Sequence, residues 1–230
     1  MTGKRSSAFN RMSNRMFAGI AARALAKRID FTQHDTALLL VDCQQDFLCR
    51  PNPLEGIVES SARELSLSKL EQLVDLARRS PMPIFYSRST NCGNAVRFPT
   101  PSQQAISSAG LLARGTSGME IAERLSPAEG DTVLKPRTAI SAFVGTGLMQ
   151  SLQSRNISRL IVAGLRTDVE VDSTARDAAE HGFQTIVVSD ACVGTTLANH
   201  EATLEMTLPR LVHAVLDVAA ISDRLHLDPA

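Results

Sequence analysis

The feature that most constrains this chain is a regular alternation of short apolar segments with amphipathic ones. Each apolar segment has the length of a strand that is buried on both faces of a sheet. The expected strands are residues 36–41, 83–87, 132–135, 159–163, 185–189 and 214–218. The apolar residues between them recur at helical spacing, which predicts helices at 66–79, 119–125, 148–155, 169–181 and 201–208. Strands that alternate with helices predict an α/β fold with a parallel sheet covered on both faces.

Composition supports an ordinary globular chain. Hydrophobic residues make up 43% of the 230 residues and charged residues 21%, which excludes wholesale disorder. The 24 basic residues balance the 24 acidic ones, so we expect no nucleic-acid partner, because such proteins usually carry a basic excess. No window holds 18 consecutive apolar residues, so we expect no membrane-spanning helix and no membrane partner.

The first 30 residues differ from the rest. They carry seven basic residues and one acidic residue, so we divide the chain into a basic extension at 1–32 and one domain at 33–230. Such a segment fits a mitochondrial transit peptide, or a helical or frayed extension of a cytoplasmic protein. The four cysteines have no CxxC spacing, which favours reduced thiols in an intracellular protein. We expect a cytoplasmic protein, with a mitochondrial location as the alternative.

In open parallel sheets, ligands bind beyond the carboxyl ends of the strands. The residues that follow the expected strands are therefore the candidates for function. They are Asp42, Lys135, residues 164–170 and Asp190.

Three motifs occupy these strand ends. They are LLLVDCQQDF at 38–47, LKPRTAISAFVGTGL at 134–148 and VAGLRTDVEVDSTARDAAEHGF at 162–183. In this order and at these spacings the chain resembles the isochorismatase-like family, also called the cysteine hydrolases. The resemblance implies a Rossmann-like, three-layer α/β sandwich with a mostly parallel sheet of about six strands. It also implies a hydrolase of small organic molecules that works without a cofactor, assembled as a homo-oligomer, either a dimer or a tetramer.

The resemblance implies an Asp–Lys–Cys triad, and it assigns Asp42 and Lys135 to the first two roles. Glu170 stands where the family has its catalytic Cys. The family also implies a cis peptide at Leu165–Arg166 and an oxyanion hole made by the backbone N–H groups of Arg166 and Glu170. Arg137 and Phe47 are expected to contact the substrate.

Glu170 has two readings that the sequence leaves open. Thr167 and Glu170 have the spacing of a capping box, so Glu170 could simply begin a helix. Alternatively, Glu170 and Asp42 converge near Lys135, and the pKa of one carboxyl rises so that it becomes a general acid. A carboxylate is a poor acyl acceptor, so we do not expect thioester chemistry in either case.

The loop after the second expected strand bears on metal binding. Nicotinamidase-like members of the family hold a metal through histidines in this loop, but YSRSTNCGNAVRF at 86–98 contains none. We therefore expect no metal. The predicted function is hydrolysis of a vinyl ether or a C–N bond by an Asp/Lys pair without a Cys nucleophile. The alternative is a catalytically silent family member that binds a ligand or a partner subunit.

Overall fold

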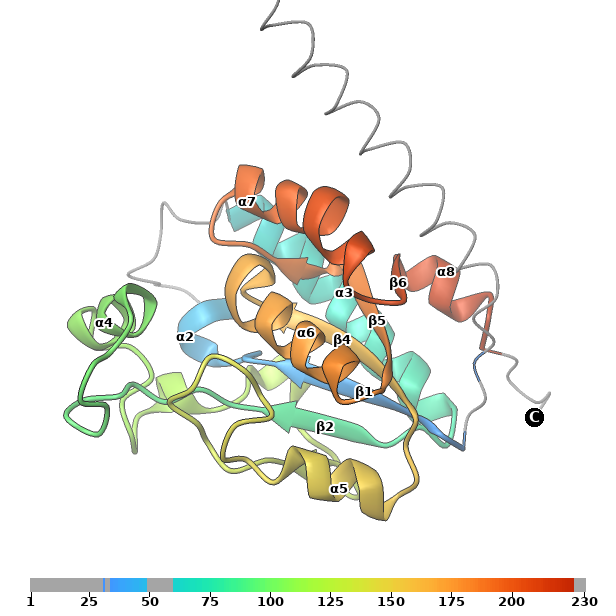
Figure 1. Ribbon diagram of the computed structural model, residues 1–230, viewed down its shortest axis with the longest axis horizontal. Coiled ribbons are helices and arrows are strands. Elements are labelled where there is room, and N and C mark those ends of the chain that lie inside the picture. The colour runs from blue at the N-terminus through green and yellow to red at the C-terminus, as the bar shows by residue number, and fades with distance from the viewer. Residues whose placement is uncertain (1–30, 32–33, 49–59, 226–230) are drawn as a thin grey trace, which may run out of the picture.

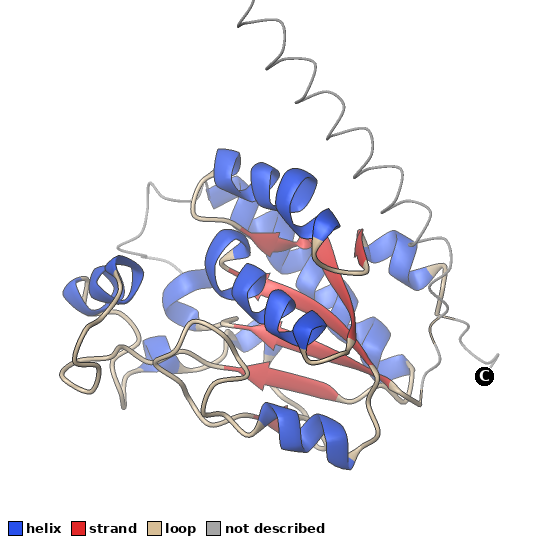
Figure 2. Cartoon of the chain, viewed as in Figure 1, coloured by secondary structure: helices blue, strands red, loops and turns tan. Residues whose placement is uncertain are grey.

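The computed structural model describes residues 31, 34–48 and 60–225 of the chain. Apart from Phe31, the expected N-terminal extension lies outside the described residues. The described chain forms a three-layer α/β sandwich (Figures 1 and 2). This confirms the fold class that the sequence predicts.

One six-stranded sheet forms the middle layer, in the order β3-β2-β1-β4-β5-β6. Every neighbouring pair of strands is parallel, as expected for strands joined by helical crossovers. The strands are β1 (Thr36–Val41), β2 (Ile84–Ser87), β3 (Thr132–Val133), β4 (Arg159–Leu165), β5 (Gln184–Val193) and β6 (Ala214–Leu216). All six lie where the sequence predicts a strand, with ends shifted by a few residues.

The helices cover both faces of this sheet. They are α2 (Gln45–Leu48), α3 (Ser60–Arg79), α4 (Pro101–Ser108), α5 (Leu148–Ser154), α6 (Asp172–Glu180), α7 (Leu197–Ala202) and α8 (Val218–Ser222). In Figure 1, α3 lies behind the sheet, whereas α5 and α6 lie in front of it. Short 3-10 turns occur at Ser117–Met119, Glu123–Leu125 and Leu208–Arg210, and π-helical turns at Thr167–Val171 and Thr203–Thr207.

The alternation of side chains along each strand divides the core in two. Leu38 and Leu40 of β1 belong to one apolar cluster, with residues of α3 and α8. Leu39 and Val41 belong to the other cluster, with residues of α5 and α6. Because a strand turns successive side chains to opposite faces, the continuous apolar run of β1 fills both cores.

Two expected helices take a different form. Residues 119–125 contain the end of one 3-10 turn and the whole of a second. The stretch between the two turns pairs with the chain after β1 through a bridge between Gln44 and Ile121. The N–H of Ala122 also donates to the carbonyl of Cys43, which is incompatible with a continuous helix there. Residues 201–208 continue α7 as a π-helical turn. The sequence reading missed α2, α4 and α8, which are at most eight residues long.

The strand order creates one natural binding crevice. From β1 the chain first adds β2 and β3 on one side of β1. It then crosses back and adds β4, β5 and β6 on the other side. The carboxyl ends of β1 and β4 therefore lie at the topological switch point of the sheet. Gly164 of β4 has φ of +125°, and a Cβ there would lie 2.1 Å from the carbonyl oxygen of Val41. Only glycine lets the two strand ends approach this closely.

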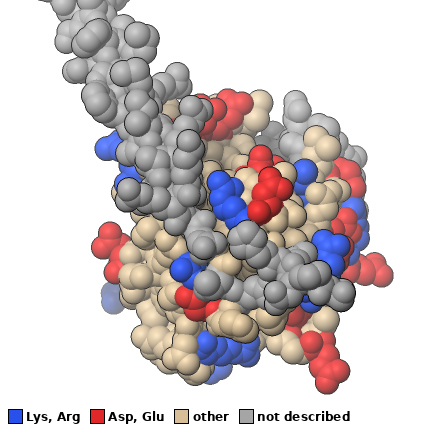
Figure 3. All heavy atoms as spheres, turned by 90° about the vertical axis from the view of Figure 1, so that its right-hand side faces the viewer, with Lys and Arg blue, Asp and Glu red and all other residues tan. Residues whose placement is uncertain are grey.

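The described surface carries charges of both signs. On the face seen in Figure 3, Lys and Arg side chains are interspersed with Asp and Glu, without a large patch of one sign among the described residues. Within the same residues, no helix combines the length and the apolar character that crossing a membrane requires.

Candidate active site

Asp42 lies directly after β1, at the switch point. Its φ of 53° is in the left-handed region, which Asp tolerates better than most residues, and its N–H donates to the carbonyl of Ser87 at 2.9 Å. The side chain is fully buried. Its carboxylate accepts Arg137 Nη1 at 2.7 Å, Arg137 Nη2 at 3.2 Å and the Ser89 hydroxyl at 2.5 Å. The charge of the Asp42 carboxylate is therefore neutralised by a bidentate ion pair with Arg137.

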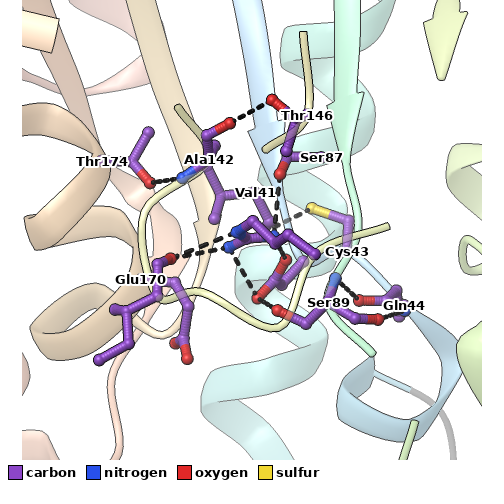
Figure 4. A network of polar contacts seen from close by, with 12 residues as sticks. Val41, Cys43, Gln44, Ser87, Ser89, Ala142, Thr146, Glu170 and Thr174 are labelled. Atoms are coloured by element: carbon purple, nitrogen blue, oxygen red, sulfur yellow. Dashed lines mark hydrogen bonds and ion pairs between the residues drawn. The ribbon is translucent and has the colours of Figure 1, made fainter. Parts of the chain in front are cut away.

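Arg137 is held from several sides by Asp42, Ser87 and Ile140, and Figure 4 labels Ser87 within this network. Its Nη1 also donates to the Ser87 hydroxyl at 2.9 Å. Its Nε and Nη2 donate to the carbonyl of Ile140 at 3.3 and 3.0 Å. The residue is only 3% exposed, so its guanidinium is fixed against Asp42 and cannot reach out to solvent.

The structure corrects the expected pairing of Asp42 with Lys135. Lys135 is exposed, and it is Arg137, two residues later, that binds Asp42. The N–H of Leu134 donates to Tyr86 and the N–H of Arg137 donates to Arg88, so the chain follows β2 through these two residues. This arrangement leaves Lys135 on the outer side.

Gln44 fixes the loop that carries Ser89. Its side-chain amide donates to the carbonyls of Ser89 at 2.9 Å and Met119 at 2.8 Å, and its side-chain oxygen accepts the Ser89 N–H at 2.8 Å. Gln44 and Ser89 are labelled in Figure 4. The sequence reading assigned no role to either residue, although Gln44 lies inside the motif at 38–47. A buried polar side chain needs such partners, and here they position the hydroxyl that binds Asp42.

Glu170 lies in the π-helical turn between β4 and α6. The peptide bond between Leu165 and Arg166 is cis, as the family resemblance implies. Glu170 is 3% exposed, and its carboxylate accepts the backbone N–H of Arg166 at 3.3 Å and Arg166 Nε at 2.9 Å. Arg166 Nη2 completes the ion pair with the other carboxylate oxygen. The N–H of Arg166, expected to serve an oxyanion, is therefore occupied by the carboxylate of Glu170.

The expected capping box between Thr167 and Glu170 is not formed. The Thr167 hydroxyl pairs with Nδ1 of His200 at 2.8 Å, a residue of α7 that is distant in the sequence. Glu170 instead accepts the N–H of Arg166, the residue just before the turn. Glu170 still satisfies a backbone N–H at the start of a helical segment, but through a different donor.

Arg166 also contacts two residues from other parts of the chain. Its Nη2 donates to the Ser102 hydroxyl of α4 at 2.8 Å. Its guanidinium carbon lies 5.8 Å from the ring centre of Phe47, which is within the range of a cation–π contact. Phe47, expected to contact the substrate, is 3% exposed and thus supports Arg166.

The electrostatic environment of the site shifts the pKa of Glu170. Burial raises the pKa of the Glu170 carboxyl, and the charge of Asp42 adds to this rise. Arg166 and Arg137 act in the opposite direction without cancelling it. Burial is thus the largest cause of the raised pKa, and the carboxylate of Asp42 is a smaller one.

A small cavity adjoins Glu170. Its volume is about 10 Å³, close to the least that holds one water molecule. Glu170, Ser89, Ser102, Cys92 and Thr138 are among the residues that line it. Residues of the second and third motifs thus meet α4 and the loop after β2 around one water-sized space.

Two of the three described thiols are too deeply buried to act as nucleophiles. Burial raises the pKa of Cys43 far above its ordinary value and the pKa of Cys192 to about 12, so both stay protonated. Cys92 lies with its sulfur 3.3 Å from the Ser107 hydroxyl. Among residues 31, 34–48 and 60–225, no group of three or more His, Cys, Asp or Glu side chains could hold a metal ion.

Comparison with known proteins places the chain in a family. The isochorismatase domain family matches residues 36–219, and the chain belongs to this family of hydrolases. The isochorismatase family protein YddQ of Bacillus subtilis is 32% identical over 162 residues, which are 70% of this chain and 79% of YddQ. The ureidoacrylate amidohydrolase RutB of Klebsiella pneumoniae is 29% identical over 188 residues, covering 75% of this chain and 79% of RutB.

Solved structures of the family have the same fold. A cysteine hydrolase from Pseudomonas syringae superposes with a TM-score of 0.75 at 22% identity, covering 86% of this chain and 95% of its own. An isochorismatase family protein from Desulfovibrio vulgaris superposes with a TM-score of 0.70 at 27% identity, covering 84% and 98%.

Proposed function

We propose that this chain is a hydrolase of small organic molecules in which Glu170 transfers the proton and no covalent intermediate forms. The observation that carries the proposal is the buried Glu170 carboxyl, whose pKa is raised and which borders a water-sized cavity at the switch point. A carboxyl with a raised pKa can act as a general acid closer to neutral pH.

The other charged groups of the site are poor proton carriers. Arg137 cannot lose its proton near neutral pH, so it cannot replace a lysine in proton transfer. Asp42 accepts hydrogen bonds from Arg137 and Ser89 on its two oxygens. We therefore assign Asp42 and Arg137 to a fixed ion pair that shapes the site and its field, and proton transfer to Glu170.

The relatives suggest the bond that is cleaved. RutB, by its name, hydrolyses the C–N bond of ureidoacrylate. In a C–N substrate, water would add to the carbonyl carbon and the C–N bond would break. Glu170 would give its proton to the leaving nitrogen and regain one from the attacking water, so that the enzyme returns to its starting state.

A vinyl ether would need the same proton donor. Glu170 would protonate the terminal vinyl carbon, and water would add to the resulting oxocarbenium carbon. One proton of the added water would return to Glu170, which leaves a hemiketal. The other proton would pass to the ether oxygen as the hemiketal separates into an alcohol and a carbonyl compound. Neither route requires a thiolate.

One observation favours a second function. Glu170 already binds both the backbone N–H and the guanidinium of Arg166, so the site is satisfied without a substrate. A family member that binds a ligand or partner without turnover would have the same arrangement.

Turnover by the full chain tests the proposal. The purified protein is assayed on ureido acids, small amides, nicotinamide and isochorismate, beside Glu170→Gln and the surface variant Arg176→Gln. We expect turnover of at least one compound, a loss of about 100-fold or more in Glu170→Gln, and full activity in Arg176→Gln.

The double variant Arg137→Lys with Glu170→Cys separates the two functions. It places a lysine beside Asp42 and a thiol at position 170, the two groups that the family triad combines with its Asp. An inactive native protein together with amide hydrolysis by the double variant contradicts the proposal, and it favours the silent scaffold.

A further inference from the structure

We propose that Arg166 is the anchor for a carboxylate group of the ligand, and that Glu170 is an internal carboxylate which this group displaces. The proposal deepens the function proposed above and rests on its assignment of the site. It names the ligand class as small molecules that carry a carboxylate.

The donors of Arg166 already form a carboxylate site. Its backbone N–H, Nε and Nη2 all point at the carboxylate of Glu170, and Nε lies 2.9 Å from one oxygen. Two side-chain N–H groups in a fixed fork match the two oxygens of a carboxylate. An external carboxylate in the same place would meet the same donors.

The pair of Arg166 and Glu170 borders the cavity. Ser102, whose hydroxyl accepts from Arg166 Nη2, and Glu170 both line this water-sized space. The side chain of Arg166 is 13% exposed, whereas that of Arg137 is 1% exposed. The ring of Phe47 supports the Arg166 guanidinium. Of the two arginines of the site, Arg166 is therefore the one that an incoming ligand can contact, and a ligand larger than water takes the place that Glu170 leaves.

Arg166 is also the more exchangeable of the two arginines. Arg137 is bound by Asp42, by the Ser87 hydroxyl and by the carbonyl of Ile140. The hydrogen-bond acceptors of the Arg166 side chain are Glu170 and Ser102. Displacing one flexible side chain is enough to free Arg166, whereas freeing Arg137 would break several contacts at once.

Charge balance couples this binding to a proton. Glu170 is influenced by Arg166 of its own segment, by Asp42 after β1 and by Arg137 after β3, and it shares the cavity with Cys92. Asp168 acts on Arg166. Two carboxylates face two guanidinium groups, so an added anion creates an excess of negative charge in a buried site. Protonation of the displaced Glu170 removes this excess. Ligand binding would thus prepare Glu170 as the proton donor.

The test is calorimetric titration of the full chain with benzoate and acetate, with benzamide and acetamide as neutral controls. We expect both carboxylates to bind more tightly as the pH falls, with uptake of about one proton for each anion bound. Titration in two buffers of different ionisation enthalpy measures this proton. We expect the two neutral amides to bind at least about tenfold more weakly.

Three variants complete the test. Glu170→Gln lacks the competing carboxylate, so benzoate should bind about tenfold or more tightly at neutral pH, without proton uptake. Arg166→Gln should not bind benzoate. Arg176→Gln, which removes the partly exposed arginine of the pair on α6, should bind as the native chain does. The pH dependence of the native chain tests the proposal even where a variant does not fold.

The proposal is overturned if the native chain binds neither carboxylate at acidic pH, if it binds acid and amide equally well, or if Arg166→Gln binds benzoate as the native chain does. Since binding is measured without turnover, the outcome separates the two proposals. Carboxylate binding without turnover removes only the proposed function. Turnover of neutral substrates without carboxylate binding removes only this inference.

Discussion

Two ion pairs on one helical segment show how differently the same spacing can be used. Arg166 with Glu170, and Asp172 with Arg176, are both separated by four residues. In the first pair the side chains are 13% and 4% exposed, whereas in the second they are 16% for Asp172 and 41% for Arg176. In the second pair Asp172 is half-buried and only Arg176 reaches well into solvent, whereas the first pair is buried on both sides, at the strand ends. Burial, which spacing does not reveal, decides which pair has chemical consequences.

The position of each pair explains the difference in burial. Arg166 directly follows β4, whose carboxyl end meets that of β1 at the switch point. Arg176 lies further along α6, where one face of the helix packs on the sheet through Thr174, Ala175 and Ala178. The other face of α6 is open to solvent. A pair at the switch point is therefore enclosed by strand ends and loops, whereas a pair on α6 is not.

A third ion pair, Asp42 with Arg137, is more buried than either of these two. The largest loss of stability is expected when this pair is broken. Arg137→Ala leaves the fully buried Asp42 carboxylate without a cation, so the free energy of unfolding should fall by about 3–5 kcal/mol. Urea denaturation of the native chain and the variant measures this change. A loss below about 1 kcal/mol would show that Asp42 gains access to water in the variant.

A smaller loss is expected for the pair at Glu170. Glu170→Ala leaves Arg166 without its counter-charge, but Arg166 is partly exposed and keeps Ser102 and Phe47. We expect the free energy of unfolding to fall by about 2–3 kcal/mol, also by urea denaturation. A variant as stable as the native chain would mean that the pair contributes nothing to folding.

The pH dependence of stability shows whether burial or the ion pair with Arg166 dominates the pKa of Glu170. The pKa of Glu170 is raised above its ordinary value of 4.5, so the folded chain binds this proton more tightly than the unfolded chain does. The contribution of Glu170 to stability is therefore fully present below about pH 4.5, and it falls as the pH rises through the raised pKa.

Measuring the free energy of unfolding of the native chain minus that of Glu170→Gln isolates this group from the other carboxyls. The difference should decrease from acidic to neutral pH. A difference that increases with pH would mean that the ion pair with Arg166 outweighs burial and lowers the pKa.

The smallest effect is expected for the pair on α6. Arg176→Gln should change the free energy of unfolding by less than about 0.5 kcal/mol, because the Arg176 side chain is 41% exposed and ion pairs of this spacing contribute little when one partner is solvated. Denaturation at low and high salt measures it, and the small difference should shrink as salt screens the charges. A change as large as that of Glu170→Ala would remove the distinction between the two pairs.

The sequence was sufficient for the fold and for the location of the site. Each strand is a short apolar run, and the strand-end rule predicts that Asp42 and the turn at 164–170 lie at the same edge of the sheet, as they do. The family resemblance also predicted the cis peptide at Leu165–Arg166. These features depend on local pattern or on a long motif, both of which a single sequence displays.

The contacts between side chains of the site could not be predicted from the sequence in the same way. Lys135 and Arg137 both follow the third strand, and only the hydrogen bonds of Leu134 and Arg137 to the segment after β2 decide which of the two faces Asp42. Similarly, Thr167 pairs with His200 across a long stretch of chain, which breaks the capping box that the spacing predicts. Such choices depend on tertiary contacts that have no signal in local spacing.

The central claim is that Glu170 holds an exchangeable proton and competes with the ligand for Arg166. A ¹³C NMR titration of the Glu170 side-chain carboxyl, assigned by its absence in Glu170→Gln, tests this claim most directly. We predict a pKa above 4.5 in the free protein and a further rise when benzoate is bound. A pKa below 4.5 that benzoate does not change would contradict the account.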